Sequence, residues 1–203
     1  HSQTTCDRNY SVYDNGQTRA KLGVQFASGH ALIDKSIIKV TIKLSRDINT
    51  GAGLLKTYSV GLYDDNGEIK REFGTGVVSD TNYSTATDGT AETEKSFTAS
   101  SAITVATGDV LALRSTTTSD ELFIGAKEGA VTDEVIGYLG LDAEGTWNTY
   151  ASTSIFYKVY GVDSNVPLQT QFEETNTRKQ YSYLYTTSGG SKGWVEMGIG
   201  GFL

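Results

Sequence analysis

The chain has 203 residues, a formal net charge of -7 at pH 7 and an apolar fraction of 37%, with Ser, Thr, Gly and Tyr making up much of the rest. This length suits one large domain with an appendage, and the composition is typical of short strands with polar outer faces, not of a disordered chain. The acidic charge is spread along the sequence, which argues against nucleic acid as a partner, and no apolar run is long enough for membrane insertion.

The N-terminal segment, residues 1–21, precedes the first clear strand pattern. Its Cys6 is the only cysteine of the chain, so an internal disulfide and a zinc site with paired cysteines are both excluded. Two roles stay open for Cys6, an inert buried thiol and an intermolecular disulfide. A chain that begins at His1 without Met is what removal of a signal peptide leaves, and trimming of the sequence would look the same.

Two-fold periodicity predicts seven or eight strands after this segment. In residues 35–45, Ile38, Val40, Ile42 and Leu44 alternate with polar residues, which indicates a half-buried strand. Shorter runs of the same kind occupy residues 22–26, 58–63, 69–73, 93–99, 109–115, 122–126 and 154–160. Regular strand spacing with so little helix favours an antiparallel β-sandwich or barrel over an α/β fold.

Turn signals lie between these runs. Asn15-Gly16, Asn66-Gly67 and Asp88-Gly89 accept the positive φ values that two-residue hairpins need, so residues 61–69 are predicted to form a β-hairpin. The best helical pattern, residues 133–139, is only about two turns long. We therefore expect helices to be minor additions to the strands.

Residues 162–203 are predicted to form a linker and a C-terminal hairpin. The linker, residues 162–178, is polar and contains the only proline of the chain. Alternating tyrosines and an apolar, Gly-rich end follow it, and we expect this end to pair with the sheet edge of a neighbouring molecule or to fold back on its own domain. The predicted assembly interface consists of Tyr181, Tyr183, Tyr185, Trp194, Phe202 and Leu203.

Several segments within residues 22–161 together resemble a known class of module. They are Leu22-Gly-Val-Gln-Phe26, Ser28-Gly-His-Ala-Leu-Ile33, Lys39-Val-Thr-Ile-Lys-Leu44, Val60-Gly-Leu-Tyr-Asp-Asp-Asn-Gly67, Gly108-Asp-Val-Leu-Ala-Leu113 and Ile155-Phe-Tyr-Lys-Val-Tyr160. The pattern is similar to carbohydrate-binding-like jelly rolls of archaeal and bacterial surface proteins and of virion tail, fibre and capsid proteins. The resemblance implies a two-sheet jelly roll in an extracellular, cell-surface or virion setting, and it implies no particular ligand.

The sequence contains no recognisable catalytic constellation. His1 and His30 are its only histidines, neither has the spacing of a metal site or a catalytic triad, and no nucleophile-elbow sequence is present. A glycosidase needs two carboxylates that face each other across a cleft, but the acidic pairs of this chain are better explained as solvated surface. We therefore expect no enzymatic activity and assign no catalytic residue.

One segment is a candidate metal site. Asp64, Asp65 and Asn66 give it the oxygen-rich composition of a calcium loop, but it lacks the spaced ligands and the distal Glu of an EF-hand. A hairpin turn explains the same residues. No cofactor is predicted, and a structural calcium ion is the one metal for which the sequence offers a candidate.

A second segment is a candidate glycan site. Sugars bind where an exposed aromatic face lies beside polar groups, and Trp147, Asn148 and Tyr150 fulfil this requirement locally. The alternative is that Trp147 packs in the core or against a sheet. Asn9 and Asn82 each begin an N-glycosylation triplet, although about two such triplets are expected by chance in a chain so rich in Ser and Thr.

These patterns together predict a secreted, non-enzymatic structural subunit of an extracellular or virion assembly. Such a subunit would be a capsid, tail, fibre or surface-filament component that forms homo-oligomers or binds other subunits. The alternative is a carbohydrate-binding module or adhesin that recognises surface glycans. An assembly subunit should form oligomers that depend on residues 179–203, whereas a lectin should bind glycan as a monomer and lose binding on Trp147→Ala.

Overall fold

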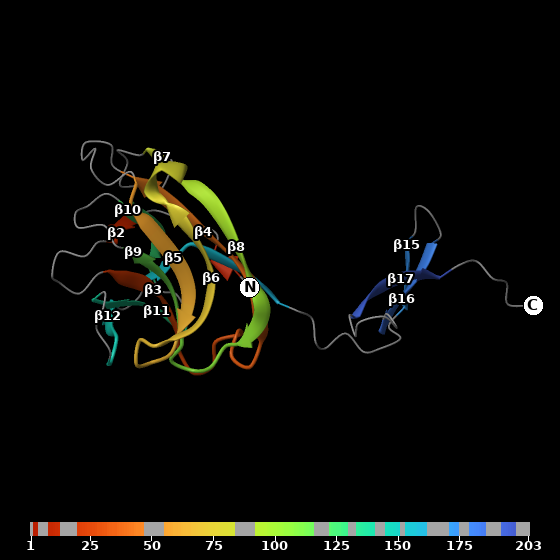
Figure 1. The fold of residues 1–203 in the computed structure, drawn as a ribbon. Helices are drawn as coiled ribbons and strands as arrows, with labels where there is room; N and C mark the ends of the chain where they lie inside the picture. Colours follow the sequence, from red (N-terminus) through yellow and green to blue (C-terminus); the bar gives the residue numbers. More distant parts are fainter. Residues whose placement is uncertain are drawn as a thin grey trace, which may run out of the picture. The chain divides into compact units, whose positions relative to one another are not determined.

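The computed structural model describes residues 2–3, 8–12, 20–46, 55–83, 92–115, 122–129, 133–140, 145–150, 153–161, 171–174, 179–185 and 192–197. Within these ranges the protein is all-β, with a single short 3-10 helix at Val78–Asp80 (Figure 1). Contacts divide the chain into two compact units, His1–Val162 and Asp163–Leu203. None of the described residues belongs to a helix of the length and hydrophobicity that crossing a membrane requires.

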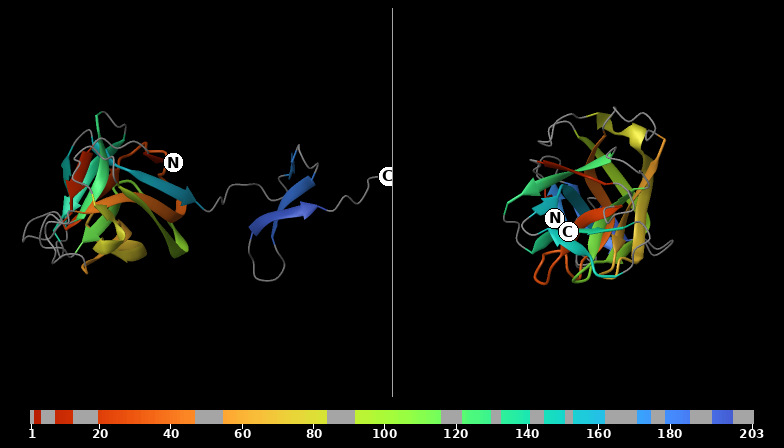
Figure 2. Two further views of the ribbon diagram at one scale, coloured as in Figure 1. Left: turned by 90° about the horizontal axis from the view of Figure 1, so that it is seen from above. Right: turned by 90° about the vertical axis from the view of Figure 1, so that its left-hand side faces the viewer.

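The larger unit is a β-sandwich of two sheets, with antiparallel pairing apart from one short parallel pair (Figure 1, Figure 2). Sheet A consists of β1 (Ser2–Gln3), β2 (Arg8–Ser11), β4 (Ser36–Arg46), β7 (Asn82–Tyr83), β8 (Thr93–Thr104), β10 (Leu122–Glu128), β13 (Thr153–Ile155) and β14 (Tyr157–Gly161). Sheet B has the order β12-β11-β3-β9-β5-β6, with β3 (Lys21–Phe26), β5 (Thr57–Tyr63), β6 (Ile69–Val77), β9 (Val110–Ser115), β11 (Glu134–Leu139) and β12 (Asn148–Tyr150). Successive strands therefore alternate largely between the two sheets.

The alternation predicted for residues 35–45 is confirmed in β4, with one local difference. Val40, Ile42 and Leu44 are buried on the face that packs against sheet B. The register with β8 shifts between Ile37 and Lys39, and such a bulge reverses the side to which the preceding residues point. Ile37 is consequently buried in place of the predicted Ile38, which is only half-buried.

The hairpin predicted at residues 61–69 is also confirmed. Strand β5 pairs with β6 as far as Tyr63 and Ile69, and the turn between them contains Gly67 with a φ of 82°. Glycine adopts such a positive φ without the steric cost that a β-carbon causes. The best helical pattern of the sequence, residues 133–139, contains strand β11 (Glu134–Leu139), because β3 and β12 pair with this segment on both sides. Pairing on both edges outweighs a helical pattern of only two turns.

The smaller unit contains a three-stranded antiparallel sheet. Its strands are β15 (Gln171–Glu174), β16 (Lys179–Tyr185) and β17 (Lys192–Met197), and β16 is the central strand. Strand β15 lies in the range that the sequence indicated as linker. Phe202 and Leu203 of the predicted assembly interface, like Cys6, lie outside the described residues.

Candidate functional site

The structure brings together the two segments that the sequence indicated as separate binding sites. The indole Nε1 of Trp147 donates a hydrogen bond of 2.9 Å to the carbonyl oxygen of Asp64, and Gly145 N donates one of 2.7 Å to Asn66 O. The Trp147 ring packs edge-to-face on Tyr63, with 5.9 Å between the ring centroids, and the residue is only 4% exposed. A buried ring offers no open face for sugar stacking, so we correct the assignment of Trp147 to glycan binding.

Several oxygen atoms of the predicted calcium loop accept hydrogen bonds from other groups of the protein. Oδ1 of Asp64 accepts hydrogen bonds of 3.0 Å from Asn66 N and 2.8 Å from Glu68 N, as in an Asx-type turn. The ammonium group of Lys21 donates a hydrogen bond of 3.2 Å to Gly67 O. In the part of the chain that the structure describes, no three His, Cys, Asp or Glu side chains gather into a metal site. This segment serves as a hairpin turn that anchors the Trp147 loop.

The remaining predicted site residues are scattered. Asn148 and Asp65 are exposed, and Asp65 Oδ1 accepts a hydrogen bond of 3.2 Å from its neighbour Asn66. Of the two glycosylation candidates, Asn82 is exposed, whereas Asn9 is half-buried in β2. The side chain of Tyr150 lies outside the described residues.

A buried polar network, which the sequence did not reveal, connects the two sheets. Nε2 of His30 lies 2.9 Å from Oε1 of Glu134 in β11, and the hydroxyl of Tyr157 in β14 donates to the same oxygen. Leu32 N donates to Nδ1 of His30 at 3.2 Å, so Nε2 carries the hydrogen that Glu134 accepts. The ring of Phe26 stacks on the imidazole at 4.8 Å. Only 3% of the His30 side chain and 2% of the Glu134 side chain are exposed, which excludes a substrate and indicates a structural role.

This network makes the stability of the fold depend on pH. Burial raises the pKa of Glu134, but hydrogen bonds with His30, Ser154 and Tyr157 outweigh burial and hold the pKa below its ordinary value of 4.5. At acidic pH the unfolded chain therefore binds a proton that the folded chain excludes, and stability is lost as pH falls from the ordinary value through the lowered one.

We expect the free energy of unfolding to fall less steeply below the ordinary Glu pKa in Glu134→Gln than in the unmodified chain. Urea denaturation at a series of pH values measures this slope. Glu94→Gln is the matched control, because Glu94 is an exposed residue of β8 whose ion pair with Lys158 is a surface contact. Equal slopes for Glu134→Gln and the unmodified chain would contradict the assignment.

The outer face of sheet B carries a polar hollow of about 120 Å³. It is lined by Thr57, Tyr58, Ser59, Glu72, Thr75 and Arg114. The strand register explains why these residues meet: Ser59 of β5 lies between Arg114 of β9 and Thr75 of β6. We call this group of residues the sheet B hollow. It contains hydrogen-bond donors and acceptors of both charges and several hydroxyl groups.

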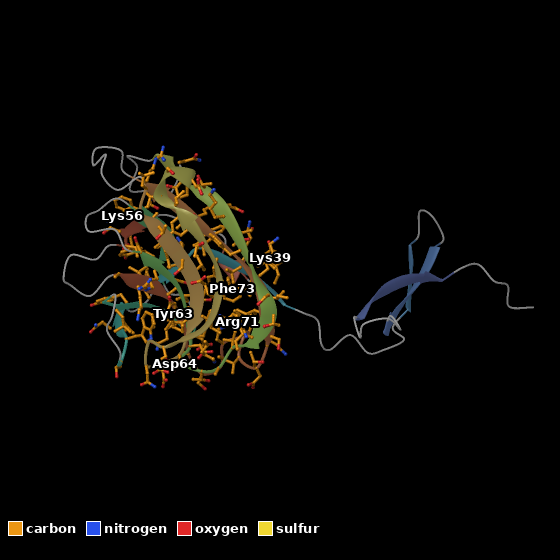
Figure 3. The ribbon with its side chains drawn as sticks, in the orientation of Figure 1. Lys39, Lys56, Tyr63, Asp64, Arg71 and Phe73 are labelled. Atoms are coloured by element: carbon orange, nitrogen blue, oxygen red, sulfur yellow. The ribbon has the colours of Figure 1, made fainter. Side chains whose placement is uncertain are left out.

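Tyr63 lies on the same strand as Ser59 of the hollow, two residues beyond Gly61 (Tyr63 is labelled in Figure 3). A β-carbon at Gly61 would lie 3.2 Å from Cε2 of Tyr63, so the ring lies over Gly61. Burial raises the pKa of Tyr63, while the charge of Arg114 and a hydrogen bond with the Ser59 hydroxyl lower it and the charge of Glu72 raises it.

Comparisons with known proteins give no relative from which a role for the hollow can be taken. Neither a family model, nor a curated protein, nor a solved structure matches the chain. The chemistry of the described residues is therefore the basis for assigning a function.

The outer face of sheet A offers a second surface with cations and aromatic rings. The ammonium of Lys39 lies 4.8 Å from the ring centroid of Tyr160, a residue that is 44% exposed. Lys43 and Lys158 lie 4.8 and 5.2 Å from the centroid of the buried Phe156 ring. These lysines cover the aromatic rings, as long cationic side chains often do on a sheet surface. This face is the alternative to the sheet B hollow as a binding surface for an acidic ligand.

Proposed function

We propose that the protein is a non-enzymatic structural subunit of an extracellular or virion assembly, such as a capsid, a tail, a fibre or a surface filament. The observation that carries the proposal is the smaller unit, Asp163–Leu203, whose described strands form one three-stranded sheet. Stable domains pack two layers around a core, and units of about 40 residues usually need oligomerisation, a metal or disulfides. A second copy of the chain, or another subunit of the assembly, would supply the missing layer.

The register of the small sheet brings aromatic residues to neighbouring positions. Tyr181, Tyr183 and Tyr185 alternate along β16, a spacing that would line one face of a strand, and Tyr183 pairs with Trp194 of β17. Phe172 of β15 pairs with Tyr181 on the other side. Aromatic residues are enriched in the centres of protein interfaces, where they contribute much of the binding energy. We call this set of five residues the aromatic face, and it is the proposed interface.

We further infer jelly-roll connectivity for the larger unit. Neighbouring strands of sheet B follow the order β3-β9-β5-β6. In sheet A they follow the order β1-β14-β4-β8, because β8 pairs with the edge of β4 opposite to β14. This order, with chain crossings between the sheets, is what two interlocked Greek keys produce. Jelly rolls occur in capsid proteins and lectins alike, so the connectivity supports the proposal without deciding between assembly and binding.

We expect the full chain to form discrete oligomers at micromolar concentration. The double variant Tyr183→Ser, Trp194→Ser should be monomeric, because its aromatic face has lost apolar surface that an oligomer would bury. Light scattering after size-exclusion chromatography measures the mass. Gln180→Ser is the matched control, since residue 180 is out of phase with the alternating positions 181, 183 and 185 and should leave the oligomer intact. A chain truncated after Gly161 should also be monomeric. A monomeric full chain would refute the proposal.

A second function, binding of surface glycans, is supported by the sheet B hollow. Sugar hydroxyls need both donors and acceptors, and the hollow provides an arginine, a glutamate and several hydroxyl groups. Assembly and glycan binding use different residues of the chain, so a subunit could combine them, as the attachment part of a fibre would.

A further inference from the structure

We propose that the sheet B hollow binds an acidic sugar residue, with Arg114 pairing with the sugar carboxylate and Glu72 accepting hydrogen bonds from sugar hydroxyls. This inference rests on the proposed glycan-binding function and names the class of ligand and its contacts. It is independent of the aromatic face, which belongs to the other unit.

Arg114 supplies the charge for the ligand carboxylate. The chain has 24 acidic and 17 basic residues, yet no described residue forms an ion pair with the half-buried Arg114. A guanidinium group presents its donors in a planar fork that matches a carboxylate, and such bidentate pairs are stronger than neutral hydrogen bonds. An arginine without a carboxylate partner, in a concave part of an acidic protein, is therefore available for an anionic ligand.

Glu72 restricts what that anion can be. Its carboxylate lines the same hollow and has no ion-pair partner among the described residues. A polyphosphate or a densely sulfated ligand would place several negative charges near it, which costs free energy. A ligand with one carboxylate and several hydroxyls avoids this repulsion, because its hydroxyls donate to Glu72 while its carboxylate lies at Arg114.

Hydroxyl side chains complete the set of contacts. Ser59 and Thr75, which are opposite each other in register, offer further donors and acceptors. The hollow therefore matches a polyhydroxylated acid better than a simple carboxylate.

The hollow has room for part of one sugar residue of a glycan. A volume of about 120 Å³ corresponds to about four water molecules in the liquid. This space accepts the carboxylate and adjoining hydroxyls of a single sugar, such as a uronic acid or a sialic acid at a chain end. Trp147 and Lys21 pack on Tyr63 of β5, the strand that also supplies Thr57, Tyr58 and Ser59 to the hollow.

The test is a titration of the full chain with sugars, in which NMR or calorimetry detects binding. The acids are glucuronate, galacturonate and N-acetylneuraminate. The uncharged methyl ester of each acid is titrated for comparison, together with glucose and galactose as neutral sugars. We expect at least one acid to bind and its methyl ester to bind about tenfold more weakly or worse, because the charged hydrogen bonds to Arg114 are lost. Arg114→Met should weaken binding of the acid to the same extent, and Arg114→Lys should restore only part of it.

Lys39→Met is the matched control, because it removes one cation from the competing surface on sheet A and should change the affinity less than twofold. Thermal unfolding of each variant verifies that the fold is intact. Loss of acid binding in Lys39→Met, and not in Arg114→Met, would overturn the assignment to the hollow. Equal binding of an acid and its ester, or binding of neutral sugars alone, would overturn the acidic class while glycan binding stands. Absence of binding by every sugar would overturn both.

Discussion

Replacing Glu134 by alanine is expected to lower the free energy of unfolding by about 3–5 kcal/mol, the cost of removing one partner from a buried charged network. The substitution leaves the hydroxyl of Tyr157 and Nε2 of His30 buried without the carboxylate oxygen that both contact. Because β11 and β14 lie in different sheets, the loss also removes a polar connection across the sandwich.

Urea denaturation of the full chain, monitored by fluorescence, measures this effect. Glu94→Ala is the control, since it removes an exposed carboxylate that pairs with Lys158 on the surface and should cost less than about 1 kcal/mol. Glu134→Gln should fall between the two, because an amide keeps one acceptor but not the charge. A loss below about 1 kcal/mol for Glu134→Ala would mean that the network contributes nothing to the fold.

Replacing Trp147 by alanine is expected to cost about 3–5 kcal/mol as well, through lost burial and the cavity that remains. Trp147 packs in a small hydrophobic cluster on the outer face of sheet B, which comprises Tyr63, Val110, Ala112, Leu139 and Trp147. Its ring also lies over Gly137, where an added β-carbon would be 3.3 Å from Cε3. Removal of the ring exposes this cluster and frees Asp64 O from its donor.

Trp147→Phe separates the two contributions. The phenyl ring keeps most of the packing and loses only the hydrogen bond to Asp64, so we expect a loss of about 1 kcal/mol. The unfolding midpoint in urea measures both variants. If Trp147→Ala unfolded like the unmodified chain, the ring would be a surface feature, and its earlier assignment to ligand binding would regain support.

The expected loss of stability in Trp147→Ala also changes how a loss of glycan binding in this variant would be interpreted. Because Trp147 packs on Tyr63 of β5, the strand that supplies Ser59 to the hollow, the substitution would disturb the sheet B hollow without any contact between the indole and a sugar. A binding assay on this variant alone therefore does not identify a lectin site. Arg114→Met is the informative variant, since Arg114 lines the hollow itself and is not a member of the Trp147 cluster.

The strands, the hairpin turn and the all-β class were predictable because each depends on neighbouring residues. Alternation in β4 places Val40, Ile42 and Leu44 on one face wherever the strand packs, and Asn66-Gly67 forms a tight turn from its own backbone preferences. The helical pattern of residues 133–139 was too short to decide the local structure, and pairing with two neighbouring strands makes the segment a strand.

The candidate sites depended on contacts that local sequence does not encode. Trp147 and the Asp64 turn lie 83 residues apart in the chain, and His30 and Glu134 lie 104 residues apart. Their meeting follows from the order of strands and the packing of two sheets, so an aromatic residue that looked like a ligand platform became part of a core. The sequence by itself determined an acidic, all-β chain with one cysteine and an aromatic C-terminal strand pair. Only the tertiary structure decided that Arg114, Ser59, Thr75 and Glu72 share one hollow, because strand register, a long-range property, places them side by side.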